Sequence, residues 1–364
     1  MKTTFYILIF ISLTFICNGQ TGAWTQKADF GGGKRNGAVS FSIGNKGYFG
    51  FGADTNAVLY NDLWEYDPLI NTWTPKANCP ATPRLYPVGF SIGSKGYVGT
   101  GFDGGGPTDD FWEYDPTLNS WTQKANCGGG VREDAVGFSI GNMGYIGTGF
   151  GASSFQNDFW QYNPLTNTWT QKTDCPIARD DATGFSIGGK GYIGLGEPAY
   201  LSDLQEYDTA TNSWTPKANF IGAARDEASV FVISGNAYVG TGIDNCGSQD
   251  FWKFDPILNS WSPIPSFPGA LRSNTSSFTI NNKGYVGIGY NYCVGFPTEV
   301  FQDFYEFDPT ISSINEKTNA NSNLIYPNPF TNVASLQFDN PTKQNCTLTL
   351  YDYSLKVPPN TRNI

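Results

Sequence analysis

A tryptophan that returns at a nearly constant interval is the feature that most constrains the fold of this 364-residue chain. The segments around it are alike, as in NTWTPKA (71–77) and NSWTQKA (119–125). Self-similarity with a period of roughly 20 to 50 residues is typical of solenoids, propellers and other arrays. The six copies lie 45 to 49 residues apart: Trp24, Trp73, Trp121, Trp169, Trp214 and Trp261.

Each repeat unit contains four short segments with the character of β-strands. In one unit they are VGFSI (88–92), GYVGTG (96–101), DFWEYDP (110–116) and NSWTQKA (119–125). These segments alternate or are uniformly apolar, and they are rich in aromatic and β-branched residues. The first two are joined by a turn, GSKG (93–96), whose residues tolerate positive φ. One unit is therefore predicted to be a four-stranded antiparallel meander.

The last unit has a third strand, DFYEFD (303–308), but no fourth strand after it. The missing strand is at the other end of the chain, in GAWTQKA (22–28). A circular array explains both facts, because an N-terminal strand that completes the last sheet leaves no long exposed edge. We therefore predict an all-β fold, a six-bladed β-propeller in which residues 22–27 pair antiparallel with residues 303–308.

These repeats resemble the kelch family across about residues 21–311. The resemblance rests on the period, the tyrosine of the second strand, the aromatic and acidic third strand and the tryptophan of the fourth. It implies a propeller made of four-stranded blades. One departure is that kelch units usually end the second strand with a Gly-Gly doublet, whereas this chain has Gly-x-Gly, as at Gly147 and Gly149.

The first nineteen residues have the composition of a signal peptide. Lys2 precedes the apolar run FYILIFISLTFI (5–16), which is too short to span a membrane. Cleavage after Gly19 would leave a propeller domain of residues 20–311 without a transmembrane segment. Lipid attachment at Cys17 is disfavoured because the bulky Ile16 precedes it.

A second resemblance begins after a polar linker, residues 312–324. The stretch from residue 325 to 364 is similar to a type IX secretion sorting domain, which opens with the motif Tyr326 to Phe330. It implies secretion or attachment at the cell surface. The later strands of such a domain are missing after Lys356, so we interpret it as partial and keep a periplasmic location as the alternative.

Charge and composition exclude several functions. The formal net charge of −10 argues against nucleic acid or an anionic membrane as a partner. The chain contains no histidine, which removes Ser-His-Asp catalysis and histidine-ligated metals. We therefore predict no catalytic residues, no cofactor, no metal site and a monomeric chain. A recurring third-strand aspartate is interpreted as structural: Asp62, Asp110, Asp158, Asp203, Asp250 and Asp303.

Six of the seven arginines occupy the same position of the repeat unit, thirteen residues before the second-strand tyrosine: Arg35, Arg84, Arg132, Arg179, Arg225 and Arg272. They begin the innermost strand, so we expect them to surround the mouth of the central channel. Two interpretations remain open. The planar guanidinium forks either tie protein groups together or bind an anionic ligand. We expect Arg132, Arg179 and Arg225, each followed by two acids, to be tied to neighbours, and Arg35, Arg84 and Arg272 to be available.

The loops between second and third strands vary from six residues (197–202) to thirteen (290–302), so binding is expected on their face of the ring. Four aromatic residues are candidate ligand contacts there: Tyr86, Tyr200, Tyr290 and Tyr292. Equivalent positions in two adjacent units predict a disulfide between Cys246 and Cys293. All ten tryptophans occupy repeat positions and are predicted to pack between blades.

Two functions are consistent with these features. The first is a non-enzymatic binding module that engages a protein or glycan ligand, possibly an anionic one, at the loop face. The second is a carbohydrate-active enzyme similar to the bacterial sialic-acid mutarotases, which are exported kelch propellers. The absence of histidine and the regularity of the repeat favour the first.

Overall fold

The structure, a computed structural model, describes residues 21–312 apart from 245, 292 and 294–297. The predicted signal peptide, the sorting domain and the linker beyond Ser312 lie outside the described residues, so they stay predictions. The described part of the chain is all-β and contains no helix. Consequently it also contains no helix that could cross a membrane.

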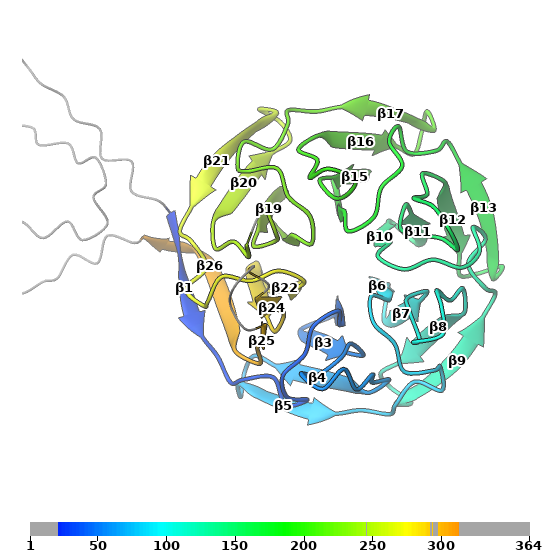
Figure 1. The fold of residues 1–364 in the computed structure, drawn as a ribbon, viewed down its shortest axis with the longest axis horizontal. Helices are drawn as coiled ribbons and strands as arrows, with labels where there is room; N and C mark the ends of the chain where they lie inside the picture. The colour runs from blue at the N-terminus through cyan, green and yellow to red at the C-terminus, as the bar shows by residue number, and fades with distance from the viewer. Residues whose placement is uncertain (1–20, 245, 292, 294–297, 313–364) are drawn as a thin grey trace, which may run out of the picture. The chain divides into compact units, whose positions relative to one another are not determined.

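Six four-stranded antiparallel sheets surround a central axis (Figure 1). Blade 1 consists of β2 (Val39–Ile43), β3 (Lys46–Gly50), β4 (Leu63–Asp67) and β5 (Thr72–Pro75). Blade 2 consists of β6 (Val88–Ile92), β7 (Lys95–Gly99), β8 (Phe111–Asp115) and β9 (Ser120–Lys124). Blade 3 consists of β10 (Val136–Ile140), β11 (Met143–Gly147), β12 (Phe159–Asn163) and β13 (Thr168–Lys172).

The next two blades repeat the pattern. Blade 4 consists of β14 (Thr183–Ile187), β15 (Lys190–Gly194), β16 (Leu204–Asp208) and β17 (Ser213–Pro216). Blade 5 consists of β18 (Ser229–Ile233), β19 (Asn236–Gly240), β20 (Phe251–Asp255) and β21 (Ser260–Ile264). The first strand of each blade lies nearest the axis and the fourth lies at the periphery (Figure 1).

Blade 6 is built from both ends of the described chain. Its strand order is β22 (Ser276–Ile280), β23 (Lys283–Gly287), β26 (Phe304–Ser312) and β1 (Thr21–Gln26). The N–H of Lys27 donates to the carbonyl of Phe304 at 2.8 Å, and Figure 1 shows blue β1 beside orange β26. The predicted closure of the ring by the N-terminal strand is confirmed.

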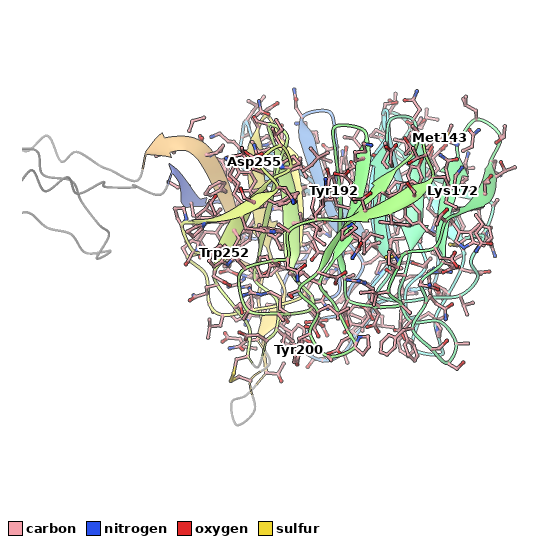
Figure 2. The ribbon with its side chains drawn as sticks, turned by 90° about the horizontal axis from the view of Figure 1, so that it is seen from above. Met143, Lys172, Tyr192, Tyr200, Trp252 and Asp255 are labelled. Atoms are coloured by element: carbon pink, nitrogen blue, oxygen red, sulfur yellow. A yellow bond between two sulfur atoms is a disulfide. The ribbon has the colours of Figure 1, made fainter. Side chains whose placement is uncertain are left out.

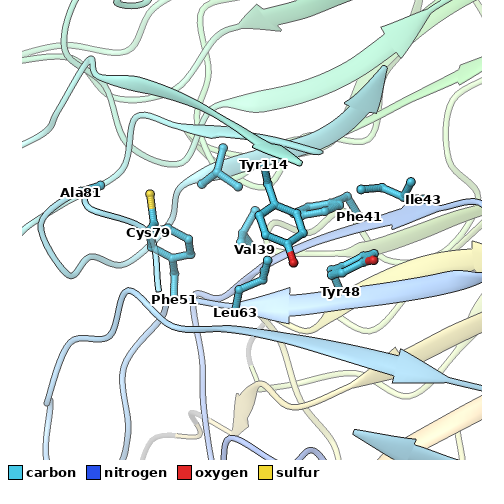
Figure 3. Close-up of a cluster of buried hydrophobic side chains, with 10 residues drawn as sticks. Val39, Phe41, Ile43, Tyr48, Phe51, Leu63, Cys79, Ala81 and Tyr114 are labelled. Carbon is cyan, nitrogen blue, oxygen red and sulfur yellow. The ribbon is translucent and has the colours of Figure 1, made fainter. Parts of the chain in front are cut away.

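The core lies between neighbouring blades because the inner strands bury alternate side chains. In β2 these are Val39, Phe41 and Ile43. Phe41 stacks on Tyr48 of the adjacent strand, with ring centroids 5.1 Å apart. Tyr114 from blade 2 packs into the same cluster (Figure 3). Each blade is therefore stabilised by its neighbour and not only by its own sheet.

The peripheral tryptophans join the blades with hydrogen bonds. Trp121 donates from Nε1 to the carbonyl of Ala77, in the preceding unit, at 2.8 Å. Asn119, two residues earlier, accepts from the N–H of the same Ala77 at 2.9 Å. All six fourth-strand tryptophans make the equivalent bond at 2.8–3.2 Å, as predicted for residues between blades. The third-strand tryptophans differ, since each donates to an aspartate of its own blade.

Candidate functional site

The two ends of the ring have different connections. Figure 2 shows Met143, at the start of β11, near one end and Tyr200, in the loop between β15 and β16, at the other. The first end carries the short turns between first and second strands and between third and fourth strands. The second end, which we call the loop face, carries the variable loops, as the sequence predicted.

Arg132 shows what the repeated arginines do. Its Nη1 donates to the carbonyl of Thr148 at 3.0 Å and to Asp158 Oδ1 at 2.9 Å. Its Nη2 donates to Asp158 Oδ2 and to the carbonyl of Gly129, both at 2.8 Å. The side chain is 0% exposed. A planar fork therefore connects the start of the first strand to the aspartate that precedes the third strand.

All six arginines make this contact, and none is more than 2% exposed. The distances to both carboxylate oxygens lie between 2.5 and 3.0 Å in each blade. The expectation that Arg35, Arg84 and Arg272 are available to a ligand is therefore wrong. Their guanidinium groups are bonded inside the blades because the third-strand aspartate is present in every unit, independently of the residues that follow the arginine.

The pairing also affects the aspartates. Burial by itself would raise the pKa of Asp110, but hydrogen bonds from Arg84 and Trp112 hold this pKa below its usual value. Asp203 and Asp250 behave in the same way. The six arginine charges are thus neutralised within the propeller.

The channel mouth on the loop face is instead formed by the residues two positions after each arginine. We call them the axial ring: Gly37, Tyr86, Asp134, Asp181, Glu227 and Asn274. All six have φ between 49° and 59°, a conformation that non-glycine residues rarely adopt. The residues that follow them line a channel cavity of about 250 Å³. Strain of this kind is often found at functional sites.

Backbone hydrogen bonds run around the axial ring from blade to blade. The N–H of Glu227 donates to the carbonyl of Asp181 at 3.0 Å, and that of Asp181 donates to Asp134 at 3.1 Å. Tyr86 makes the same bond to Gly37 at 2.9 Å. A Cβ on Gly37 would lie 3.0 Å from the Tyr86 ring, so Tyr86 lies against this glycine. The ring therefore holds side chains from different blades together at the axis.

Three consecutive members of the ring are acids. The carboxyl groups of Asp134 and Asp181 lie within hydrogen-bonding reach of each other, and burial raises the pKa of both. A hydrogen bond between two carboxyl groups requires a shared proton. Burial also raises the pKa of Glu227, whose Oε1 accepts from Asn274 and from the Tyr290 hydroxyl, both at 3.1 Å.

Further acids surround these three. Burial, followed by repulsion from Glu197, raises the pKa of Asp180 to about 6. Burial, followed by repulsion from Glu227 and Glu197, raises the pKa of Asp226 to about 8. We call the whole cluster the acidic mouth: Glu133, Asp134, Asp180, Asp181, Glu197, Asp226 and Glu227. No member forms an ion pair with any described residue.

This arrangement predicts that the ligand-free protein becomes more stable as the pH falls from about 8 to about 5. A carboxyl with a raised pKa binds more protons when folded, so the free energy of unfolding falls as the pH rises through that pKa. Below about pH 4 the trend reverses, because Asp110, Asp203 and Asp250 have lowered pKa values and lose their charge there. Thermal unfolding should show a Tm higher by about 5 °C at the lower pH.

Asp226→Asn should reduce the increase in Tm between about pH 8 and about pH 5, because Asp226 has a strongly raised pKa. Glu299→Gln, which removes an exposed carboxyl from the same face, is the matched control and should leave the rise unchanged. A Tm that increases steadily from pH 5 to pH 8 would contradict the assignment of uncompensated acids to the mouth.

Three of the predicted aromatic candidates lie beside these acids. Tyr86 belongs to the axial ring, and Tyr290 donates to Glu227. Tyr200 is 37% exposed, and burial and the negative charge of Asp226 raise its pKa. Tyr292 lies outside the described residues. These three tyrosines therefore lie beside the acidic mouth. The arginines, which were expected to form the binding site with them, are bonded within the blades.

A disulfide joins Cys246 and Cys293, whose Cα atoms are 4.6 Å apart. These cysteines come from the long loops of blades 5 and 6. The second of these loops also forms a short hairpin of β24 (Tyr290–Asn291) and β25 (Glu299–Val300). The covalent link and the hairpin restrict the loop from which Tyr290 reaches Glu227.

The acidic mouth was not predicted from the sequence. The acids after Arg132, Arg179 and Arg225 were considered as partners of those arginines, whereas the structure pairs the arginines with the third-strand aspartates and places Asp134, Asp181 and Glu227 in the axial ring. A signal was present, because the two positions after each arginine change from blade to blade while the arginine itself is repeated in all six. Within the described ranges, no group of three acidic, cysteine or histidine residues is placed to hold a metal ion.

Comparisons with known proteins identify the fold alone. No family model matches the chain, and no curated protein matches it. Among solved structures, it is similar to one titled "Structure of YjhT", with a TM-score of 0.63 and 16% sequence identity. The match covers 74% of this chain and 94% of the other.

Proposed function

We propose that this chain is an exported kelch-type propeller that binds a protein or glycan at its loop face without catalysing a reaction. The signal-like N-terminus and the Cys246–Cys293 disulfide support a destination outside the reducing cytoplasm. The motif from Tyr326 to Phe330 supports delivery by type IX secretion to the surface or the medium.

The proposal of a binding site rests on the acidic mouth. Buried carboxylate oxygens normally accept a hydrogen bond, yet Asp180 Oδ1, Asp226 Oδ1 and Glu227 Oε2 are buried without a partner. Glu227 belongs to the axial ring, and Asp180 and Asp226 directly precede ring members, on the face with the most variable loops. A bound molecule that donates hydrogen bonds would satisfy them, which explains why such a costly arrangement is kept.

The charges of the acidic mouth and of the repeated arginines indicate which kind of ligand can bind. Guanidinium groups that could receive an anion are enclosed and paired within the blades. An acidic sugar such as sialic acid would be repelled by the mouth, so the mutarotase alternative has no supporting contact among the described residues. The ligand is therefore neutral or positively charged at the mouth, and not anionic as the arginines first suggested.

The test is a glycan and peptide array probed with the purified chain. Ligands found in this way should bind at least about 10-fold more weakly to Tyr200→Ala, because an aromatic contact of this kind contributes more than about 1.4 kcal/mol. Leu165→Ala removes an exposed side chain at the opposite end and should leave affinity unchanged. Equal losses in both variants, or no bound ligand, would contradict the proposal.

The absence of catalysis is tested separately. NMR of N-acetylneuraminic acid should show the same rate of anomer exchange with and without the protein. Acceleration that is lost in Glu227→Gln would instead establish the mutarotase alternative.

A further inference from the structure

We propose that the acidic mouth is a binding site for a primary ammonium group of the ligand, received by Asp226 and Glu227 beside Tyr86 and Tyr290. This inference rests on the proposed function, and it names the chemical group that the loop face recognises. Four observations carry it: the charge, the unpartnered oxygens, the absence of a metal-holding group and the placement of the phenol rings.

The first observation is the uncompensated charge. Seven carboxyl groups gather at the mouth, and no described lysine or arginine pairs with them, since the arginines bind the third-strand aspartates. Neighbouring carboxylates repel one another strongly where water is partly excluded. Burial and this repulsion raise the pKa of Asp134, Asp181 and Asp226, and a bound cation would favour their ionised forms.

The second observation is a set of buried atoms that need a donor. Asp226 is 7% exposed, and its Oδ1 has no hydrogen-bond partner. Glu227 Oε2 is also buried without a partner, while Oε1 is bonded to Asn274 and Tyr290. An ammonium group suits these oxygens because it has three donors and no acceptor.

The third observation concerns the type of cation. The described residues contain no group of three acidic, cysteine or histidine side chains that could hold a metal ion. Calcium would require six to eight oxygen ligands at close range. A primary ammonium needs only two or three acceptors, and these can come from different blades.

The fourth observation is the position of two phenols. Tyr86 and Tyr290 both lie close enough to Glu227 for its charge to raise the pKa of each hydroxyl, after the larger effect of burial. Both therefore stay neutral and retain an electron-rich ring, to which cations are attracted. Asp134, Asp181 and Glu227 are half-buried, on the face where Tyr200 is 37% exposed.

The experiment measures binding of 1,4-diaminobutane to the full chain by calorimetry, with 1,4-butanediol as the neutral analogue of equal length. The diamine should bind, with an affinity that falls as salt is added, and the diol should not. Glu227→Gln and Asp226→Asn should each weaken binding at least about 10-fold, whereas Glu299→Gln should change it less than twofold. Equal binding of diol and diamine, an equal loss in Glu299→Gln, or no diamine binding would overturn the inference.

Thermal unfolding excludes a trivial loss of structure. Glu227→Gln removes a charge that has no cationic partner among the described residues, so its Tm should equal or exceed that of the parent chain. A variant that loses both binding and Tm would show that Glu227 has a structural role, and the inference would be wrong.

Two further arms identify the source of the ammonium group. Glucosamine is compared with glucose, and a lysine-containing peptide with its Nζ-acetylated form. Stronger binding of the amine in either pair supports the inference and assigns the ligand to amino sugars or to peptides. Array ligands that lack an ammonium group, yet still depend on Tyr200, would overturn this inference and leave the proposed function intact.

Discussion

A chain that lacks residues 20–28 is expected to unfold at a much lower temperature than the intact chain. Trp24 of β1 packs among Phe231, Phe251, Phe267 and Phe307, with ring centroids 5.0–6.1 Å apart. Trp24 is partly buried, and the loss of a fully buried tryptophan costs about 3–5 kcal/mol, which is an upper bound for this side chain. The deletion also leaves β26 as an exposed edge and removes the contacts that close the ring. Thermal unfolding followed by tryptophan fluorescence measures the change.

The control is a synthetic peptide of residues 20–28 added to the truncated chain. It should occupy the vacant edge and raise the Tm in a concentration-dependent way. The same peptide with Trp24→Ala should have little effect. If the truncated chain is as stable as the intact one, then β1 does not close the ring.

Arg132→Met should lower the free energy of unfolding by about 3–5 kcal/mol, because it leaves the Asp158 carboxylate without its cationic partner in a partly buried site. Arg132→Lys should cost about 1–3 kcal/mol, since one ammonium cannot replace a bidentate fork. Urea denaturation with linear extrapolation gives both values.

Two further variants test the cause. Lys34→Met removes an exposed positive charge next to a repeated arginine and should change stability by less than about 0.5 kcal/mol. Combining Arg132→Met with Asp158→Leu should recover part of the loss, because an apolar pair avoids the unpaired charge. A loss in Lys34→Met as large as that in Arg132→Met would show that net charge, and not the buried fork, is responsible.

The blade number and the closure could be predicted because they depend on local patterns. Alternating apolar residues such as Val39, Phe41 and Ile43 define each strand, and short turns join strands that are adjacent in sequence. The last unit has no fourth strand after residue 308, and an additional strand is present at residues 22–28. Only the pairing of these two segments completes every four-stranded sheet. The disulfide followed from the same repeat, since Cys246 and Cys293 occupy equivalent loop positions.

The arginine contacts could be predicted only in part. In the sequence, an arginine recurs at one position of all six repeats, and an aspartate recurs at another. It did not show that the two meet, because Arg132 and Asp158 lie 26 residues apart on different strands. The prediction expected Arg132 to be tied to neighbouring groups and drew attention to the adjacent acids Glu133 and Asp134, whereas the ion pair forms with Asp158.

The repeat alone specifies a six-bladed ring, because it sets the strands and their order before any long-range contact is known. The positions of the charges, in contrast, depend on how the blades are arranged in three dimensions. Asp134, Asp181 and Glu227 are 46 or 47 residues apart in sequence, and the ring brings them to one axis through backbone hydrogen bonds between blades. These acidic residues approach one another because the whole array of blades is curved, and no local sequence pattern encodes that curvature. The acidic mouth therefore forms only when the ring is closed.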